Sequence, residues 1–269
     1  MPAVLVTGAS RGIGLAITRH MSDRGWDVHA TARSAGNLGD LGDLGRLPHV
    51  HPIQLDVTDR ATVAGLHQHL PLALDGVVNN AGIIVQGPVE SLSLDDLTRQ
   101  LDVNVTSQIA VVQAALPHLR QARGRVVFMS SVSGLITLPG TGAYSASKYA
   151  LESLADALRI ELRPWRIPVS LIEPGPTRTD MWGDALADYD HMTDQLSPAH
   201  RELYASHLAG NRKLLSRVQK VVAAVDRALT SKRPKRRYRT DNLSRAQLAL
   251  TSIAPTAATD AVLSAATTT

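Results

Sequence analysis

The feature that most constrains the fold is the alternation of short β-branched segments with longer amphipathic ones. Six segments have strand character, namely 4–7, 28–32, 53–57, 76–80, 125–130 and 169–174. Helical patterns occur between them, near 13–24, 59–70, 95–121 and 143–163. Strands separated by helices pair in parallel, and right-handed crossovers place the helices on both faces of the sheet. We therefore expect an α/β fold with a doubly wound parallel sheet.

The composition favours one large domain with an aliphatic interior. The chain has 269 residues, and 44% of them are hydrophobic, but it contains only one Phe and three Trp. Buried parallel strands are rich in Val, Ile and Leu, which suits this composition. A single α/β domain spanning 1–269 fits the length.

Cysteine content and hydropathy restrict both the chemistry and the location. The chain has no Cys, which excludes disulfides, thiol catalysis and thiolate metal ligands. No apolar run approaches the roughly 20 residues needed to span a bilayer. The N-terminus, MPAVLVTGAS, enters the first strand without the pattern of a signal peptide. We expect a cytoplasmic protein that has no membrane partner.

The chain changes character after the sixth strand. Residues 177–235 carry a helical pattern, and we expect a substrate lid there with a helix following it, because open α/β sheets bind ligands beyond the carboxyl ends of their strands. Residues 255–269 are expected to form a frayed tail. We interpret the basic run 232–239 as a solvated loop. A contact with substrate or with a subunit is the second interpretation, and nucleic-acid binding is the third.

A glycine-rich turn, Thr7–Gly14, follows the first strand and opens a helix. The amide groups at such a helix start can bind a pyrophosphate. Its spacing is G-x-x-x-G-x-G, so the strict G-x-G-x-x-G dinucleotide pattern fails. The same residues match the hydrolase pattern G-x-S-x-G with Ser10 as nucleophile. We disfavour a hydrolase, because the turn follows the first strand and no well-placed His is present.

The end of the second strand indicates which dinucleotide is bound. An Asp or Glu there would bind the ribose 2′-hydroxyl of NAD, but the sequence is Thr31-Ala32-Arg33-Ser34. Arg33 suits a 2′-phosphate, and Arg11 in the glycine turn can reach the same group. The cofactor is therefore predicted to be NADP(H).

Together these motifs resemble the short-chain dehydrogenase/reductase family over roughly residues 3–180. The resemblance rests on the glycine turn and on motifs at matching spacing, namely Asp56, Asn79-Asn80-Ala81-Gly82, Asn104, Ser131, Tyr144-Ser145-Ala146-Ser147-Lys148 and Pro174-Gly175. It implies a Rossmann fold and the transfer of a hydride between a nicotinamide and a carbonyl or alcohol carbon.

Tyr144 and Lys148 are four residues apart, so on a helix they share one face. A nearby cation lowers the pKa of a phenol, by about 1 to 3, and makes it a better acid or base. Ser131 can donate a hydrogen bond to the substrate oxygen, with Ser130 and Ser133 as nearby competitors. The resemblance implies that Asn104 holds a water that connects Lys148 to solvent.

The resemblance also implies the cofactor contacts residue by residue. These are Gly8, Ser10, Arg11, Gly12, Ile13, Gly14, Arg33, Asp56, Val57, Asn80, Ala81, Gly82, Tyr144, Lys148, Pro174, Gly175, Thr177 and Thr179. Asp56 and Val57 are assigned to the adenine, and Pro174-Gly175 to the nicotinamide.

The sequence thus predicts an NADP(H)-dependent oxidoreductase that reduces a lipophilic ketone. The alternative is a catalytically silent NADP(H) sensor on the same scaffold. No metal is expected, because the pairs His49/His51 and His67/His69 have no third ligand at useful spacing. The expected partner is a small carbonyl or alcohol substrate, and no nucleic acid is expected. We also expect the chain to form a dimer or tetramer through the helices at 95–121 and 143–163.

Overall fold

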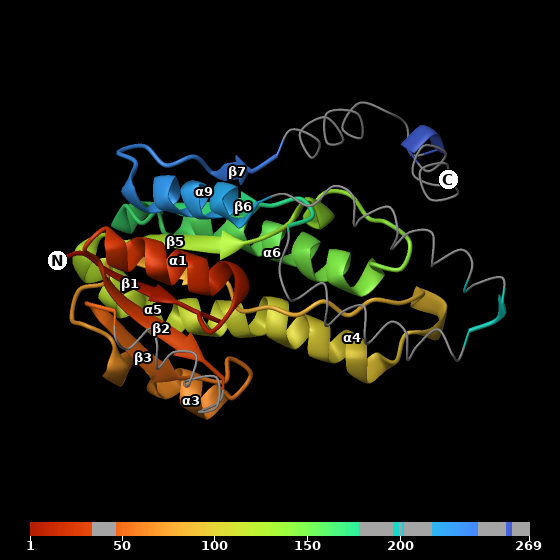
Figure 1. Ribbon diagram of the computed structural model, residues 1–269, viewed down its shortest axis with the longest axis horizontal. Helices are drawn as coiled ribbons and strands as arrows, with labels where there is room; N and C mark the ends of the chain where they lie inside the picture. Colours follow the sequence, from red (N-terminus) through yellow and green to blue (C-terminus); the bar gives the residue numbers. More distant parts are fainter. Residues whose placement is uncertain (34–46, 178–195, 199–200, 202–216, 242–256, 260–269) are drawn as a thin grey trace.

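A seven-stranded parallel sheet forms the centre of the protein (Figure 1). The computed structural model describes residues 1–33, 47–177, 196–198, 201, 217–241 and 257–259. The strands are β1 (Ala3–Val6), β2 (Asp27–Ala32), β3 (Val50–Gln54), β4 (Gly76–Asn79), β5 (Arg125–Met129), β6 (Val169–Glu173) and β7 (Arg237–Arg239). Their order is β3-β2-β1-β4-β5-β6-β7, and all neighbours pair in parallel. The order reverses between β1 and β4, which is where sheets of this kind bind ligands.

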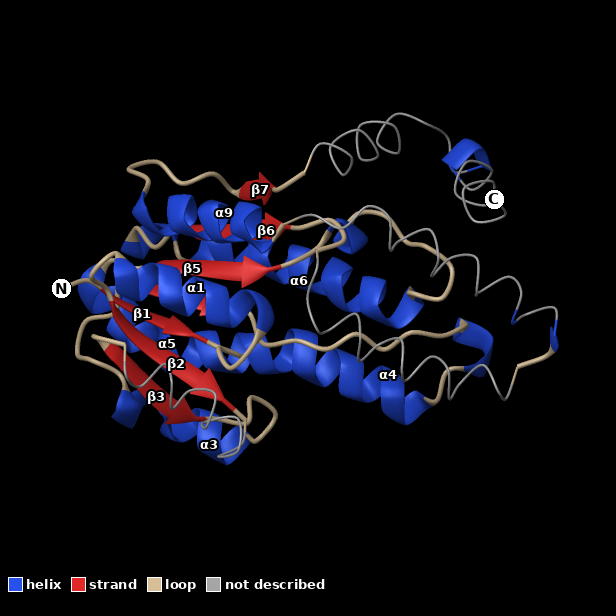
Figure 2. Cartoon of the chain, in the orientation of Figure 1, coloured by secondary structure: helices blue, strands red, loops and turns tan. Residues whose placement is uncertain are grey.

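Helices cover both faces of the sheet (Figure 2). The α-helices are α1 (Gly12–Asp23), α3 (Arg60–Gly65), α4 (Leu94–Leu101), α5 (Ser107–Ala122), α6 (Gly142–Glu161) and α9 (Val218–Thr230). A π-helical turn, η3 (Asp102–Thr106), joins α4 to α5. The short 3-10 helices are η1 (Leu66–His69), η2 (Val89–Ser91), η4 (Val132–Gly134) and η5 (Arg163–Trp165).

Alternating residues along a strand belong to two separate hydrophobic cores, one on each face of the sheet. In β1, Val4 and Val6 pack with α1 and α9, whereas Leu5 packs with α5 and α6 on the other face. This period of two follows from the pleat of a strand, and burial on both faces explains the continuous apolar runs. The doubly wound sheet predicted from the sequence is therefore confirmed.

Two strand predictions were wrong in detail. The third strand was placed at 53–57 but runs over Val50–Gln54, because its His and Pro residues masked the pattern. Pro52 is tolerated there, since β3 lies at the sheet edge. A seventh strand, β7, was not foreseen at all.

The basic run 232–239 is only partly the solvated loop that was expected. Residues 237–239 form β7, and Tyr238 between the two arginines is 7% exposed. A segment of three residues with a single apolar side chain is too short to show the alternation that identifies a strand. Helix α9, within the predicted 177–235 segment, packs its Val221 and Val225 into the core beside α1.

Much of the predicted lid and tail lies outside the described residues, including 178–195, 202–216 and 260–269. Thr179 lies there too. Among the helices that are described, none is long and apolar enough to cross a membrane.

Candidate active site

The glycine turn between β1 and α1 can accept an anion close to its backbone. Gly8 and Gly12 have φ angles of +64° and +56°, a region that favours glycine. A Cβ on Gly14 would lie 2.2 Å from the carbonyl oxygen of Gly8. Arg11 precedes α1, and within the described chain its side chain makes no capping hydrogen bond to the helix. The first amides of α1 are therefore left for a ligand, as a pyrophosphate site requires.

Hydrogen bonds tie the glycine turn to the predicted Asn79–Gly82 motif across the β1–β4 junction. The Asn80 side-chain amide donates to the carbonyls of Thr7, at 2.9 Å, and of Gly8, at 3.1 Å. The Thr7 hydroxyl accepts hydrogen bonds from the backbone amides of Asn80 and Ala81, each at 3.0 Å. These hydrogen bonds thus hold together the glycine turn and the Asn79–Gly82 motif, which lie about 70 residues apart in sequence.

The two arginines assigned to a 2′-phosphate follow neighbouring strand ends. The Ala9 amide donates to the Thr31 carbonyl at 2.8 Å, which fixes the glycine turn against the end of β2. Arg33 follows β2 directly, and both Arg11 and Arg33 are exposed. Both residues therefore lie beside the glycine turn, at the carboxyl edge of the sheet.

The remaining cofactor residues assigned by resemblance lie at the ends of β3 and β6. Asp56 lies two residues beyond β3, and its Oδ1 accepts hydrogen bonds from the amide and hydroxyl of Thr58 at 2.9 and 2.7 Å. After β6, the Gly175 amide donates to Asp241 Oδ2 at 3.0 Å. The Thr177 hydroxyl donates to the Gly175 carbonyl at 2.9 Å. Nothing in the sequence pattern pointed to Asp241.

Asn104 sits in the π-helical turn, and its side chain is fully buried. Its amide donates to the Ile83 carbonyl at 3.0 Å and to the Ser147 hydroxyl at 3.1 Å, and its oxygen accepts from the Ile83 amide at 2.9 Å. The side chain therefore fixes the backbone after the Asn79–Gly82 motif. The water relay assigned to Asn104 stays a prediction.

Two further helix residues support that same backbone segment and were missed. Gln100 accepts from the Val85 amide at 2.6 Å, and Gln108 donates to the Ala81 carbonyl at 3.0 Å. Gln100, Asn104 and Gln108 occur at four-residue intervals, so they share one helix face. Amide side chains at that spacing were the available signal in the sequence.

Three of the four predicted catalytic residues, Ser131, Tyr144 and Lys148, converge at the carboxyl end of β5. Lys148 donates from Nζ to the Met129 carbonyl at 2.8 Å, and Nζ lies 5.5 Å from the centre of the Tyr144 ring. Ser131 follows Met129 by two residues and interacts with the Tyr144 hydroxyl. Ser130, its sequence competitor, instead donates to Glu152 at 2.6 Å. The Ser131 hydroxyl also donates to the Pro174 carbonyl at 3.4 Å, and the choice of Ser131 over Ser130 as the catalytic serine stays a prediction.

The electrostatics of Tyr144 differ from the sequence expectation. Burial raises the pKa of Tyr144 to about 12, although the hydrogen bond with Ser131 acts in the opposite direction. Burial also lowers the pKa of Lys148 to about 8, while Glu152 acts to raise it. The expected lowering of the phenol pKa is therefore wrong for the protein alone, because desolvation outweighs the hydrogen bond with Ser131. At neutral pH the phenol is protonated, as a proton donor must be.

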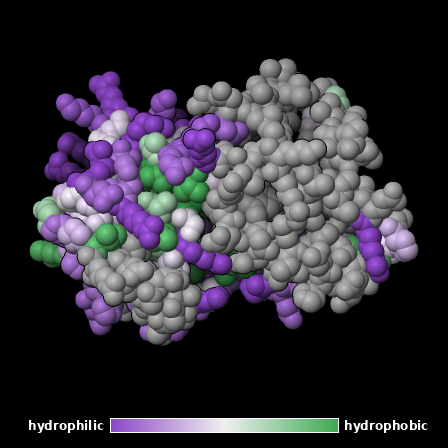
Figure 3. Space-filling model, viewed as in Figure 1, coloured by the Kyte–Doolittle hydropathy of each residue, from purple (hydrophilic) through white to green (hydrophobic). Residues whose placement is uncertain are grey.

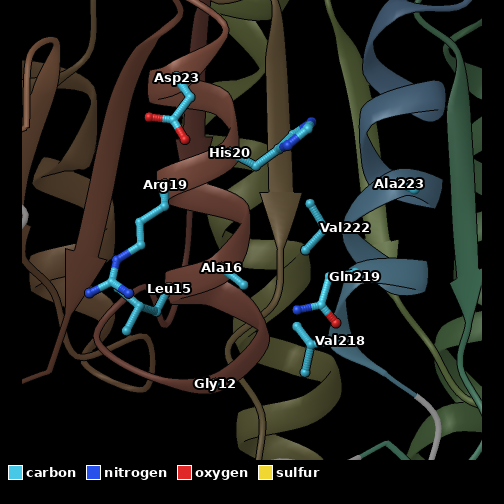
Figure 4. Close-up of a pocket in the computed structure, with 10 residues that line it drawn as sticks. All are labelled: Gly12, Leu15, Ala16, Arg19, His20, Asp23, Val218, Gln219, Val222 and Ala223. Carbon is cyan, nitrogen blue, oxygen red and sulfur yellow. The ribbon is translucent and has the colours of Figure 1, made fainter.

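A separate hollow of about 520 Å³ lies between α1 and α9 (Figure 4). Its lining includes the apolar side chains of Leu15, Ala16, Val218, Val222 and Ala223. In Figure 3 hydrophobic side chains gather near the middle of the described part of this face, with hydrophilic ones around them. The hollow contains Gly12 from the turn but none of the predicted catalytic residues.

Among the described residues, no group of three His, Cys, Asp or Glu side chains could hold a metal ion. Asp27 Oδ1 lies 3.7 Å from Nδ1 of His49 and 3.5 Å from Nε2 of His51.

Comparisons with known proteins show which family and which structures this chain resembles. The family model described as short chain dehydrogenase matches residues 2–190. The NADPH-dependent 3-dehydrocapnine reductase of Ornithobacterium rhinotracheale is 32% identical, over 88% of this chain and 87% of its own. Human 17-beta-hydroxysteroid dehydrogenase type 1 is 34% identical, over 87% of this chain and 76% of its own.

Solved structures share the architecture. A short-chain dehydrogenase from Streptomyces avermitilis superposes with a TM-score of 0.79 and 28% identity, covering 94% of this chain and 93% of its own. Two Burkholderia structures below 25% identity share the fold, and one is a complex with NADP and the other with NAD. The fold by itself therefore does not choose between the two cofactors.

Proposed function

Because the chain belongs to the short-chain dehydrogenase family, we propose that it is an NADP(H)-dependent oxidoreductase acting on a carbonyl or secondary alcohol. We propose reduction of a lipophilic ketone as its direction and substrate class. The observation that carries the proposal is the convergence of Ser131, Tyr144 and Lys148 at the end of β5.

The described residues fit the nicotinamide cofactor in two places. The turn around Gly8, Gly12 and Gly14 leaves backbone amides at the start of α1 for the pyrophosphate. The catalytic group lies at the same edge of the sheet, at the carboxyl end of β5. One dinucleotide extended along this edge would contact both.

The chemistry of the chain's own residues follows from their protonation states. When bound, the nicotinamide supplies the hydride that reduces the carbonyl carbon. Ser131 donates a hydrogen bond to the carbonyl oxygen and stabilises the charge that develops there. Tyr144 gives its proton to that oxygen, and the nearby Lys148 ammonium stabilises the phenolate that is left. Asn104 is proposed to hold the water that returns a proton through Lys148.

Arg11 and Arg33 support the choice of NADP(H) over NAD(H). Both are exposed beside the glycine turn, and guanidiniums bind phosphate through paired hydrogen bonds. The family relative named as NADPH-dependent is consistent with this choice. The lipophilic substrate class is supported by a relative that is named a hydroxysteroid dehydrogenase.

The remaining parts of the proposal concern the whole chain. We propose a single domain over 1–269, a cytoplasmic location and a homo-oligomer. A catalytically silent NADP(H) sensor is the second candidate on the same scaffold. Intact Ser131, Tyr144 and Lys148 favour the enzyme, since a sensor has no need of a proton donor.

A carbonyl and alcohol panel assayed with NADPH and with NADH separates these possibilities. We expect loss of NADPH absorbance with lipophilic ketones and much weaker turnover with NADH. Arg33→Ala should raise the KM for NADPH and leave that for NADH nearly unchanged. Equal turnover with both cofactors would contradict the roles of Arg11 and Arg33. NADPH binding without turnover of any panel member would favour the sensor.

A further inference from the structure

Glu152 is a buried carboxylate that the proposed reaction does not yet use. It lies one helical turn after Lys148 on α6, and the two residues are 6% and 4% exposed. Residues four apart on a helix face each other. A carboxylate is rarely buried unless charges or hydrogen bonds compensate for the lost water.

Consecutive residues at the end of β5 hold Lys148 and Glu152. The Met129 carbonyl accepts from Lys148 Nζ at 2.8 Å, and the next residue, Ser130, donates its hydroxyl to Glu152 Oε1 at 2.6 Å. A Cβ on Gly134 would lie 3.1 Å from Glu152 Cγ and 3.2 Å from the Lys148 carbonyl oxygen. The two charged side chains are therefore packed against the strand end that also presents Ser131.

On its other side, Glu152 contacts the unforeseen strand β7. Arg237 Nε donates to Glu152 Oε2 at 2.9 Å, and its Nη2 donates to Asp156 Oδ2 at 2.9 Å. Arg237 Nε also lies 3.2 Å from Oε1 of the buried Glu173 on β6, and Arg239 pairs with Glu173 at 3.1 Å.

The charged groups around Glu152 thus come from three elements. They are Lys148 and Asp156 on α6, Glu173 on β6, and Arg237 on β7, with Arg239 acting through Glu173. Both carboxylate oxygens of Glu152 are engaged, one by Ser130 and one by Arg237. The network fixes the carboxylate of a residue that lies one helical turn after Lys148 on α6.

We propose that Glu152 is a positioning residue for this active site: anchored by Ser130 and Arg237, its carboxylate keeps the buried Lys148 ammonium charged beside Tyr144. The inference rests on the proposed function, because it assumes that Lys148 must be charged to stabilise the phenolate. It gives β7 and the basic run a role in supporting catalysis.

The direction of the effect follows from burial. Desolvation lowers the pKa of Lys148 to about 8, and Glu152 acts against that lowering. Without the carboxylate, the pKa of Lys148 falls further, and the lysine loses its proton nearer neutrality. At a pH above both values, a pKa that is lower by one reduces the charged fraction of the lysine about tenfold.

The direct test is an NMR titration of Lys148 in the cofactor-free protein. The chain is labelled with ¹³C at lysine Cε, and the Lys148 signal is assigned by its loss in Lys148→Arg. We expect Glu152→Gln to lower the pKa of Lys148 by about one or more. Glu152→Asp retains the charge and should leave the pKa close to that of the unsubstituted protein.

Asp156→Asn is the matched control, because it removes a carboxylate from the same helix and from the same arginine, one turn farther from Lys148. It should leave the Lys148 titration unmoved. If Glu152→Gln does not fold, Glu152→Met removes the same charge with an apolar side chain of similar size. An unchanged Lys148 pKa in the folded charge-free variant overturns the inference, as does an equal change in Asp156→Asn.

The kinetic arm separates this inference from the proposed function. With a ketone that the protein reduces, the basic limb of the pH profile of kcat/KM should move to lower pH in Glu152→Gln. The size of this move should match the change in the Lys148 pKa measured by NMR. A protein that turns over no carbonyl contradicts the proposed function whatever the titration shows. Normal turnover with an unmoved basic limb contradicts the role of Glu152 alone.

Discussion

At the scale of single residues, the chemistry depends on the partly buried Tyr144 and the buried Lys148 beside it. The phenol, with its pKa raised to about 12, keeps its proton at neutral pH, and the lysine, with its pKa lowered to about 8, keeps most of its charge. A protonated donor beside a cation suits the reduction of a carbonyl better than the oxidation of an alcohol. Motif spacing could identify both residues, but the direction of the phenol pKa depends on burial that no spacing reveals.

His29 makes stability depend on pH, away from the active site. Burial and the stacked ring of His51, 4.9 Å away, lower the pKa of His29 to about 4. The unfolded chain, with an ordinary pKa near 6.5, binds this proton more readily, so folding stability falls as the pH drops from about 6.5 to about 4.

His29→Gln should flatten that part of the stability profile, by an amount on the order of 1 kcal/mol because the ring keeps some solvent contact. Urea unfolding between pH 7 and pH 4 measures the difference. His67→Gln, which removes an exposed histidine, is the control and should retain the slope. A parallel loss of slope in both variants would contradict the assignment to His29.

At the scale of elements, the turn between β1 and α1 is fixed by close backbone packing. Gly14→Ala would place its Cβ 2.2 Å from the Gly8 carbonyl and 2.6 Å from the Asn80 amide. We expect a loss of about 1 to 3 kcal/mol in the free energy of unfolding. NADPH affinity, followed by fluorescence titration, should fall together with it.

Gly65→Ala is the matched substitution, since a Cβ at the end of α3 meets no described atom within 4 Å. It should be neutral or slightly stabilising, because Ala favours the helix. If Gly14→Ala bound NADPH as tightly as Gly65→Ala, the turn would not be the pyrophosphate site.

The elements differ in how well the sequence predicts them. Six strands with β-branched runs were recognisable, but β3 was displaced by His and Pro residues at a sheet edge, and β7 carries only Tyr238 as an apolar signal. The helix at 95–121 contains a π-turn that places Asn104 against Ile83. Such a turn is set by tertiary hydrogen bonds, so a periodicity of 3.6 residues does not reveal it.

At the scale of the whole molecule, the outer surface of α6 and η5 carries exposed apolar side chains. Ile160 is 66% exposed and Trp165 is 44% exposed, with Arg120 of α5 lying 4.5 Å above the Trp165 ring. Apolar side chains exposed in a cluster often mark an interface between chains. We therefore expect light scattering to give two or four times the chain mass.

Ile160→Glu should shift that mass toward the monomer if this surface forms the contact, because an interface does not readily bury an unpaired charge. Leu72→Glu, at a position before β4 that is 81% exposed, is the control and should leave the mass unchanged. A monomeric mass for the unsubstituted protein would refute the oligomer.

The central claim is that the Tyr144 phenol transfers the proton in a nicotinamide-dependent reaction. The most direct measurement compares kcat for a turned-over ketone between the unsubstituted protein and Tyr144→Phe, with NADPH affinity and melting temperature recorded for both. We predict that kcat falls by about 10² to 10⁴ while binding and melting temperature stay nearly unchanged. Turnover by Tyr144→Phe at the rate of the unsubstituted protein would contradict the account.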